Sequence, residues 1–357
     1  MGRQVALALS GGGARGMAHI GVIRELLSRG YSIHSISGCS IGSVVGAMYA
    51  MGKLQEFADF ILEDGAQAIF SQLDFTFSDQ GFIKGQKLIE RLQEFAPDCN
   101  LEDLPVRLSI VATDMNTGED VVYETGSVYR AIRASVAIPA VITAVHEADR
   151  WLVDGGVVNP LPLNLLHRKE GDLLVAVNLY ASPVFETENV ADVPEKTATE
   201  GGVVSQMRAR WSELKAWKGN LVQSVFDDTH KKMGYFTTLR LMSELASKRL
   251  AEVAIQSAAV DALIEIPIAS CGLFSFAECA RMIQMGQEHT RNVLNVLEAK
   301  EETRKDGSSR SGSIGVNYFG CCTVMNEKRI FYDKEDAGLL GTGSSASSFS
   351  CNVFFII

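Results

Sequence analysis

The first fifty residues alternate between short apolar runs and longer stretches with apolar residues at helical spacing. Residues 5–9 form a continuous apolar run before a glycine cluster, which is typical of a strand buried on both faces. Residues 14–29 carry an apolar stripe of helical period and stop at Gly30. Because 31–37 and 41–52 repeat this order, the pattern predicts a largely parallel sheet with helices on both faces.

Further buried strands are predicted where apolar runs return, at 104–115, 173–180 and 261–268. Residues 183–202 are rich in Glu, Thr, Val and Pro and are interpreted as a surface loop. From 296 the chain becomes charged and then rich in Gly and Ser, so it buries too little apolar surface to offset the entropy of ordering. We therefore expect 296–357 to be a disordered, low-complexity tail.

The composition narrows the classes of function. The chain has 357 residues, 46% of them hydrophobic, which suits one large globular domain or two small ones. A net charge of -10 without a long basic cluster argues against nucleic acid as a partner. The 7 cysteines include no C-x-x-C pair, which indicates reduced thiols in a cytoplasmic protein, and we expect no metal site and no cofactor. The opening apolar run is too short for a signal peptide or a membrane span.

The glycine cluster reads "GGGARG" and satisfies the G-x-G-x-x-G pattern through Gly11, Gly13 and Gly16. A dinucleotide-binding fold would place an acidic residue about 20 positions later, at the end of the second strand. No carboxylate occurs between Glu25 and Glu56, so this interpretation loses its main support. Glycine N–H groups at a helix N-terminus can instead stabilise an oxyanion that develops during attack on a carbonyl. A tight turn that binds nothing is the alternative.

A second motif, "GCSIG", places Ser40 between a predicted strand and a predicted helix. Gly38 and Gly42 permit the sharp turn that a projecting nucleophile needs, whereas the ordinary alternative makes Ser40 the N-cap of the helix. Both glycine-rich turns follow consecutive strands, so in a parallel sheet they lie at the same edge. The two motifs together favour a hydrolytic serine.

The base that would activate Ser40 is less obvious. The histidines that follow it lie in turns or polar helical stretches: His146, His167, His230 and His289. In contrast, Asp154 ends the apolar run "WLV" and is followed by Gly155 and Gly156. A carboxylate at a strand end, with space around it, can reach a neighbouring serine directly, although Asp-Gly also simply forms turns.

In this order and spacing, "GGGARG", "GCSIG" and "DGG" resemble the three motifs of the patatin-like phospholipase family, especially bacterial members related to neuropathy target esterase. The resemblance implies a three-layer α/β/α sandwich with a mainly parallel central sheet. It implies a Ser40–Asp154 dyad without histidine, and an oxyanion hole formed by Gly11, Gly12 and Gly13. It also implies that Arg15 orients this loop.

The resemblance divides the chain into a catalytic core at 5–167, the remainder of the same fold at 168–295 with a helical insertion near 183–235, and the tail at 296–357. It implies hydrolysis of a carboxylic ester of a lipid, such as a lysophospholipid, a phospholipid or another monoacyl ester. The alternative is a lipid-binding regulatory protein with little turnover.

Residues 203–222 combine apolar positions at helical spacing with tryptophans and basic side chains. Such a segment can lie in a membrane interface as an amphipathic helix, which predicts peripheral membrane contact by a cytoplasmic protein. An ordinary surface helix packed on the core is the alternative. The oligomeric state does not follow from the sequence.

Overall fold

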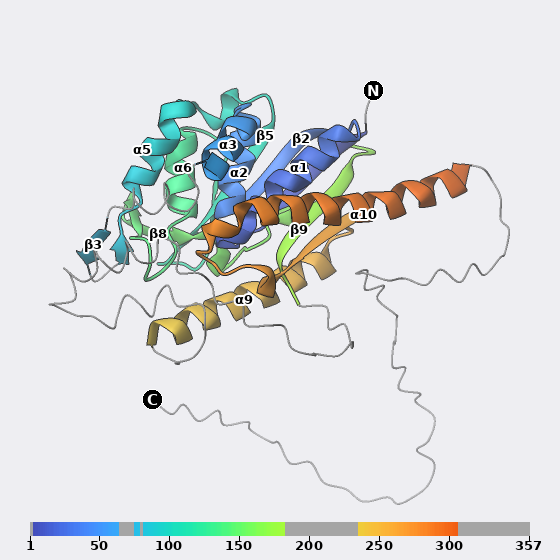
Figure 1. Ribbon diagram of the computed structural model, residues 1–357. Helices are drawn as coiled ribbons and strands as arrows, with labels where there is room; N and C mark the ends of the chain where they lie inside the picture. The colour runs from blue at the N-terminus through green and yellow to red at the C-terminus, as the bar shows by residue number, and fades with distance from the viewer. Residues whose placement is uncertain (1–2, 64–74, 79–80, 183–234, 306–357) are drawn as a thin grey trace, which may run out of the picture. The chain divides into compact units, whose positions relative to one another are not determined.

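A computed structural model describes residues 3–63, 75–78, 81–182 and 235–305. The predicted loop at 183–202, the predicted helix at 203–222 and nearly all of the predicted insertion near 183–235 lie outside these ranges. Within them the chain forms a central sheet with helices against both faces (Figure 1). None of the described helices is both long enough and apolar enough to cross a bilayer.

In the described part of the chain, the central sheet has the strand order β10-β9-β1-β2-β5-β8-β7, and β6 also pairs with β5. The strands are β1 (Gln4–Leu9), β2 (Ser32–Cys39), β5 (Arg107–Asp114), β6 (Asp120–Tyr123), β7 (Val145–Glu147), β8 (Arg150–Asp154), β9 (Leu173–Ala181) and β10 (Ala262–Pro267), while β3 (Phe75–Ser78) and β4 (Gly81–Ile83) form a separate pair. The pairings from β10 to β5 are parallel. Those that join β6, β7 and β8 are antiparallel, so the prediction of a mainly parallel sheet is confirmed.

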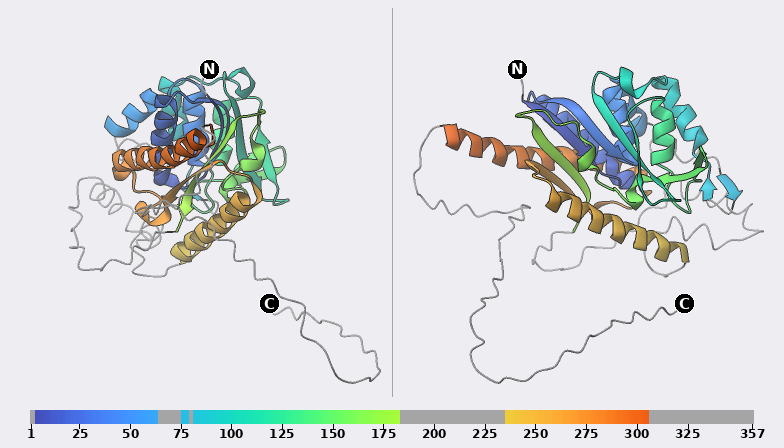
Figure 2. Two further views of the ribbon diagram at one scale, coloured as in Figure 1. Left: turned by 90° about the vertical axis from the view of Figure 1, so that its right-hand side faces the viewer. Right: turned by 180° about the vertical axis from the view of Figure 1, so that it is seen from behind.

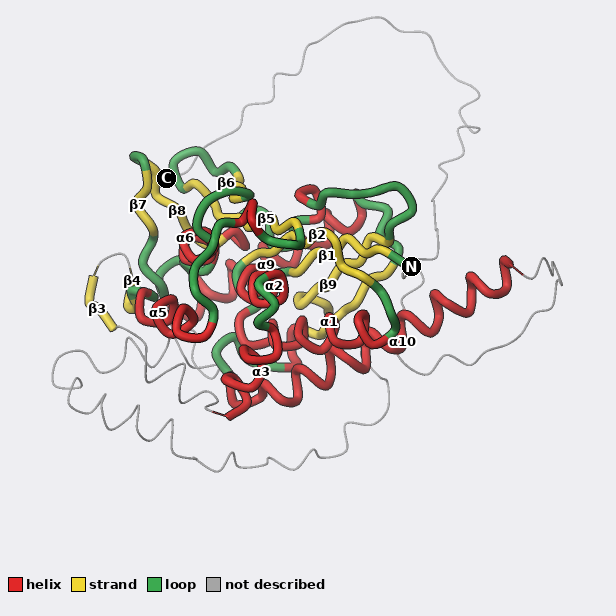
Figure 3. The backbone as a smooth tube through the Cα atoms, turned by 90° about the horizontal axis from the view of Figure 1, so that it is seen from above, coloured by secondary structure: helices red, strands yellow, loops and turns green. Residues whose placement is uncertain are grey.

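Helices cover the two faces of the sheet unequally. The described helices are α1 (Ala18–Ser28), α2 (Ile41–Ala50), α3 (Leu54–Glu63), α5 (Gln86–Phe95), α6 (Val128–Ser135), α9 (Tyr235–Ser257) and α10 (Cys279–Lys305). Alternate residues of β1 separate the two cores, because Leu7 joins the cluster under α1 and α2 whereas Ala8 joins a smaller one with Ala251 of α9. Figure 2 shows α9 apart from the other helices, and the view in Figure 3 places α1 and α10 together on one side of the strands.

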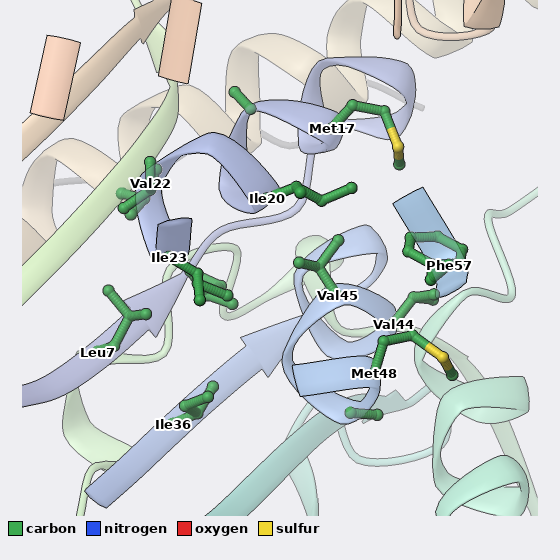
Figure 4. Close-up of a cluster of buried hydrophobic side chains, with 14 of the residues drawn as sticks. Leu7, Met17, Ile20, Val22, Ile23, Ile36, Val44, Val45, Met48 and Phe57 are labelled. Carbon is green, nitrogen blue, oxygen red and sulfur yellow. The ribbon is translucent and has the colours of Figure 1, made fainter. Parts of the chain in front are cut away.

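The larger core fixes the two helices that follow the predicted motifs. Figure 4 shows Leu7 and Ile36 on neighbouring strands with Ile23 of α1 close by. Val45 and Met48 of α2 are fully buried in the same cluster. Burying an aliphatic side chain of this size stabilises a fold by roughly 1.5–3 kcal/mol, so the start of α2 is held by its packing.

The helix α10 extends beyond the point where the tail was predicted to begin. It continues to Lys305 and lies along α1, so 296–305 are helical. The side chains of Arg29 and Tyr31 donate hydrogen bonds to Glu298 at 2.7 and 2.9 Å. These contacts from the other end of the sequence explain why a charged stretch that looks unstructured is ordered here. The remainder of the predicted tail lies outside the described residues.

Candidate active site

The parallel pairing of β1 with β2 brings the two glycine-rich motifs to one edge of the sheet. Leu9 ends β1 and lies opposite Gly38, and Cys39 ends β2. The glycine loop and Ser40 follow these strand ends directly. The expectation that both motifs share the carboxyl edge is therefore confirmed.

Ser40 forms a strained turn between β2 and α2. Its φ of 52° is positive, a conformation that costs a non-glycine residue about 1–3 kcal/mol. The Ser40 N–H donates to the Ser135 hydroxyl at 2.9 Å, and the Ser40 carbonyl accepts from the Ser43 hydroxyl at 2.6 Å. The side chain of Ser40 makes no capping hydrogen bond to α2, so the interpretation of this residue as a side-chain N-cap is wrong.

The glycines beside Ser40 allow α2 to begin directly against the sheet. A Cβ atom on Gly42 would lie 2.4 Å from the carbonyl oxygen of Leu9, and one on Gly38 would lie 2.7 Å from the backbone of Ser43. Neither distance is compatible with a side chain, because backbone atoms cannot move aside as a side chain can. Gly38 and Gly42 therefore set the close approach that aims Ser40 outward.

The sheet register brings Asp154 to Ser40. Cys39 pairs with Val111 of β5, and Asp154 pairs with the next residue, Ala112, on the same side, because β6 pairs with both of these β5 residues on the other side. The Ser40 hydroxyl donates to Oδ2 of Asp154 at 2.5 Å across 114 residues of sequence. Gly155 fits at this point because a Cβ there would lie 2.5 Å from the Val111 carbonyl oxygen.

The Asp154 carboxylate is buried but not isolated. Its Oδ1 accepts the Gly156 N–H at 2.8 Å and a long contact from the Cys39 thiol at 3.8 Å. Burial raises the pKa of Asp154 from 3.8 to about 6, while the hydrogen bonds from Ser40, Gly156 and Cys39 act in the opposite direction. At neutral pH the group is therefore ionised and close to the pKa range in which a general base works well.

The glycine loop presents backbone donors beside Ser40. The Gly11 N–H is already used, because it donates to the Pro160 carbonyl at 3.0 Å. Gly12 and Gly13 have positive φ angles of 152° and 59°, and both line the same cavity as Ser40. Within the described ranges their N–H groups meet no acceptor. The structure thus offers two of the three glycines as oxyanion donors.

Two side chains hold this loop, and one of them was not identified from the sequence. His19 is fully buried, and its Nε2 donates to the Ser10 carbonyl at 2.9 Å, while burial lowers the pKa of His19 to about 4. The sequence could have indicated His19 through its position in the first turn of α1, close to the glycine cluster. Arg15 is buried and donates to the carbonyls of Ile268 and Cys271 at 3.0 and 3.2 Å.

Arg15 also links the loop to α9, through a 2.6 Å ion pair with Glu244. Three acceptors therefore engage the guanidinium, which positions the loop. The next residue, Gly16, lies close to the start of α2. A Cβ atom on it would lie 2.3 Å from the Ile41 side chain, so glycine is needed here.

Ser40 and Asp154 open into a cavity of about 440 Å³. Apart from the dyad, the loop and a few polar groups, its wall is apolar and comes from the segment 138–141, from Leu273 and from α9, which contributes Leu239 and Met242. The contribution of α9 could not be inferred from the sequence, since it depends on how the helix crosses the sheet edge. The arrangement suits a substrate with an apolar body and one ester carbonyl.

Comparisons with known proteins identify the family of the chain. A family model for patatin-like phospholipases matches residues 7–167. An uncharacterized NTE family protein of Mycobacterium tuberculosis is 32% identical over 337 residues, covering 84% of this chain and 93% of that protein. The chain belongs to the patatin-like phospholipase family.

A more distant member of the patatin-like family is patatin-like phospholipase domain-containing protein 6 of Mus musculus, which is 25% identical over 257 residues. That match covers 70% of this chain and 18% of the mouse protein. Among solved structures, VipD from Legionella pneumophila aligns with a TM-score of 0.47 and 15% identity, covering 83% of this chain and 67% of that one.

The histidines of this patatin-like protein that the structure describes after Ser40 lie away from the cavity. The ring of His167 bonds to Glu124 at 2.7 Å. Its backbone N–H donates to the Ser35 hydroxyl, toward the end of β2 that lies away from Ser40. His289 bonds to the Glu265 carbonyl at 2.6 Å, and the ring of His146 in β7 contacts that of Trp151 in β8 at a tilted angle. His230 lies outside the described residues.

Proposed function

We propose that the protein is a serine acyl hydrolase that cleaves carboxylic esters of lipids through Ser40 and Asp154. The observation that supports this most strongly is the 2.5 Å hydrogen bond from the Ser40 hydroxyl to a buried carboxylate. Two backbone donors and an apolar cavity adjoin this pair. Membership of the patatin-like phospholipase family implies lipid acyl hydrolysis.

In the first half of the reaction, Asp154 accepts the hydroxyl proton as Ser40 Oγ attacks the ester carbonyl. The N–H groups of Gly12 and Gly13 stabilise the resulting oxyanion. As the tetrahedral intermediate collapses, the bond to the alcohol oxygen breaks. Asp154 gives its proton to that oxygen, so a neutral alcohol leaves and the acyl group stays on Ser40.

In the second half, a water molecule takes the place of the alcohol. It gives a proton to Asp154 and attacks the acyl carbonyl, which again places an oxyanion beside the glycine loop. Cleavage of the bond to Ser40 Oγ releases the carboxylic acid. The proton on Asp154 returns to Ser40 Oγ, which restores the free enzyme.

The substrate class we propose is a lipid with an accessible ester, such as a lysophospholipid, a phospholipid or another monoacyl ester. The rim of the cavity supports contact with a lipid aggregate. Met115 and Met242 both line the cavity and are 56% and 63% exposed. Apolar side chains exposed beside a cavity favour peripheral contact with a lipid surface.

The test compares Ser40→Ala and Asp154→Asn with the unmodified chain on a soluble p-nitrophenyl ester and on lysophospholipid. Each change should lower kcat/KM by at least ~10³, and the double variant should lose little more because the two residues act as one unit. His167→Gln serves as the histidine control and should keep most of the rate.

Labelling with a fluorophosphonate reports on Ser40 independently of the substrate. The unmodified chain should be labelled and Ser40→Ala should not. Ester hydrolysis by the Ser40→Ala variant would refute the assignment of Ser40 as the nucleophile. A folded, unmodified protein that resists the probe would favour the regulatory lipid-binding alternative.

A further inference from the structure

A second, smaller pocket of about 110 Å³ meets the main cavity at Ser40. The two spaces share Gly13, Ser40, Ile138 and Leu273 in their walls. Ser40 therefore stands at a junction, with one space on each side of any carbonyl bound to its oxygen. We call these spaces the large cavity and the small pocket.

The small pocket lacks polar side chains apart from Ser40. Its wall is formed by apolar residues of α2, α3, α5 and α6 and of the segment 273–276. Figure 4 labels Val44 and Phe57 from this wall, together with Met17, which follows the glycine loop and also lines the pocket. Phe60, another wall residue, packs against Phe95 with ring centroids 5.5 Å apart and planes tilted by 39°. Such a wall offers nothing that could hydrogen-bond to an alcohol or a phosphate.

The position of Asp154 distinguishes the two spaces. Asp154 lines the large cavity and does not line the small pocket. In the mechanism above it gives its proton to the leaving alcohol, so that alcohol must lie on the side of the large cavity. The acyl chain extends from the other side of the same carbonyl carbon. The space available to it there is the small pocket.

We propose that the small pocket binds the acyl chain of the substrate and that the large cavity binds the leaving alcohol. This inference rests on the proposed function, since it assumes an acyl group on Ser40. The enzyme then selects substrates by acyl length through the small pocket. The residues that set this selection are Val44, Phe57, Leu88, Leu92 and Val136.

The proposed role of the small pocket can be measured as the dependence of kcat/KM on the length of the acyl chain. Each methylene group that moves from water into an apolar wall should raise kcat/KM about fourfold, as long as it finds room. In a series of p-nitrophenyl esters the leaving group is constant, so changes along the series report on the acyl side alone. Because a space of about 110 Å³ has room for only a few methylene groups, the unmodified protein should prefer butyrate over acetate.

The test inserts the same bulk into each space. Leu88→Trp narrows the small pocket from a half-buried position on α5, and Leu239→Trp is its matched control on the α9 wall of the large cavity. Leu88→Trp should lower the butyrate-to-acetate ratio of kcat/KM about tenfold. Leu239→Trp should change both esters by the same factor, so its ratio should stay that of the unmodified protein.

A second variant, Val136→Phe, reaches the small pocket from the end of α6 and should lower the ratio in the same direction. Circular dichroism and fluorophosphonate labelling identify any variant that has lost its fold. The proposal is overturned if the unmodified protein hydrolyses both esters equally well. It is also overturned if Leu239→Trp lowers the ratio while Leu88→Trp and Val136→Phe do not. Survival of hydrolysis in Ser40→Ala would instead refute the proposed function itself.

Discussion

Replacing Asp154 with Asn should make the protein inactive and, at neutral pH, more stable. Burial raises the pKa of Asp154 from 3.8 to about 6. An acid with a higher pKa in the folded state binds its proton more tightly when folded, so stability falls as pH rises above about 4. Above about pH 6 the full loss of folding stability is present. An asparagine carries no charge, so the variant does not lose this stability.

The magnitude follows from the difference in proton affinity. At about 1.4 kcal/mol for each tenfold change, the interval between 3.8 and about 6 corresponds to about 3 kcal/mol at pH 7 and about 1 kcal/mol at pH 4.5. This is an upper limit, because the hydrogen bonds to the carboxylate also change. Asn can still accept the Gly156 N–H through Oδ1 and donate to Ser40 Oγ through its amide.

The assay is equilibrium unfolding in urea at pH 7 and at pH 4.5 for the unmodified chain and Asp154→Asn. The variant should be more stable at pH 7, by up to about 3 kcal/mol, and the gain should shrink at pH 4.5. Asp172→Asn is the matched control of opposite sign. Although burial tends to raise the pKa of Asp172, hydrogen bonds from Lys169, Arg168 and His34 lower it overall, so this change should destabilise at pH 7.

Two results would refute the reasoning about Asp154. One is a variant that is less stable than the unmodified protein at pH 7, which would mean that the carboxylate stabilises the fold through its hydrogen bonds. The other is a stability difference that does not change with pH, which would mean that the carboxylate titrates as in the unfolded chain.

The remaining predictions concern rate and packing. Because Asp154 must be ionised to act as a base, kcat/KM should rise with pH, reach half its plateau at about 6 and fall to about one tenth of it at pH 5, whereas an inflection near 4 would contradict the buried pKa. Gly42→Ala should destabilise by several kcal/mol, on the order of the cost of overpacking or more, because its Cβ would meet the Leu9 carbonyl oxygen at 2.4 Å. Gly46→Ala in the same helix would meet only side-chain atoms, at 3.0 Å and beyond, so thermal unfolding should show a much smaller loss; equal losses would show that the backbone clash is not decisive.

The sequence was most informative where local signals determine the structure. The apolar runs and glycine stops placed β1, α1, β2 and α2 correctly, because each element is short and buried. The strand-end position of Asp154 indicated a base where the histidines gave none. These inferences needed only the neighbouring residues and the geometry of a parallel sheet.

Long-range contacts account for what the sequence could not show. The Gly11 N–H is used by the carbonyl of Pro160, and Arg15 is engaged by Glu244, which is 229 residues away. No local pattern encodes either partner. The antiparallel arrangement of β7 and β8 likewise depends on where the chain returns to β5.

Asp154 lies next to Ser40 because both strands pair with β5, and this dependence has a consequence for folding. Ser40 belongs to the parallel part of the sheet, whereas Asp154 arrives on an antiparallel strand that pairs with β5 later in the sequence. A slip of β8 by one residue would turn Val153 toward Ser40 and Asp154 toward the opposite face. Phosphonate titration during refolding would therefore count only molecules in which β8 has docked in register. The rate of covalent labelling thus reports the docking of β8, an event that spectroscopic signals from the helices do not follow.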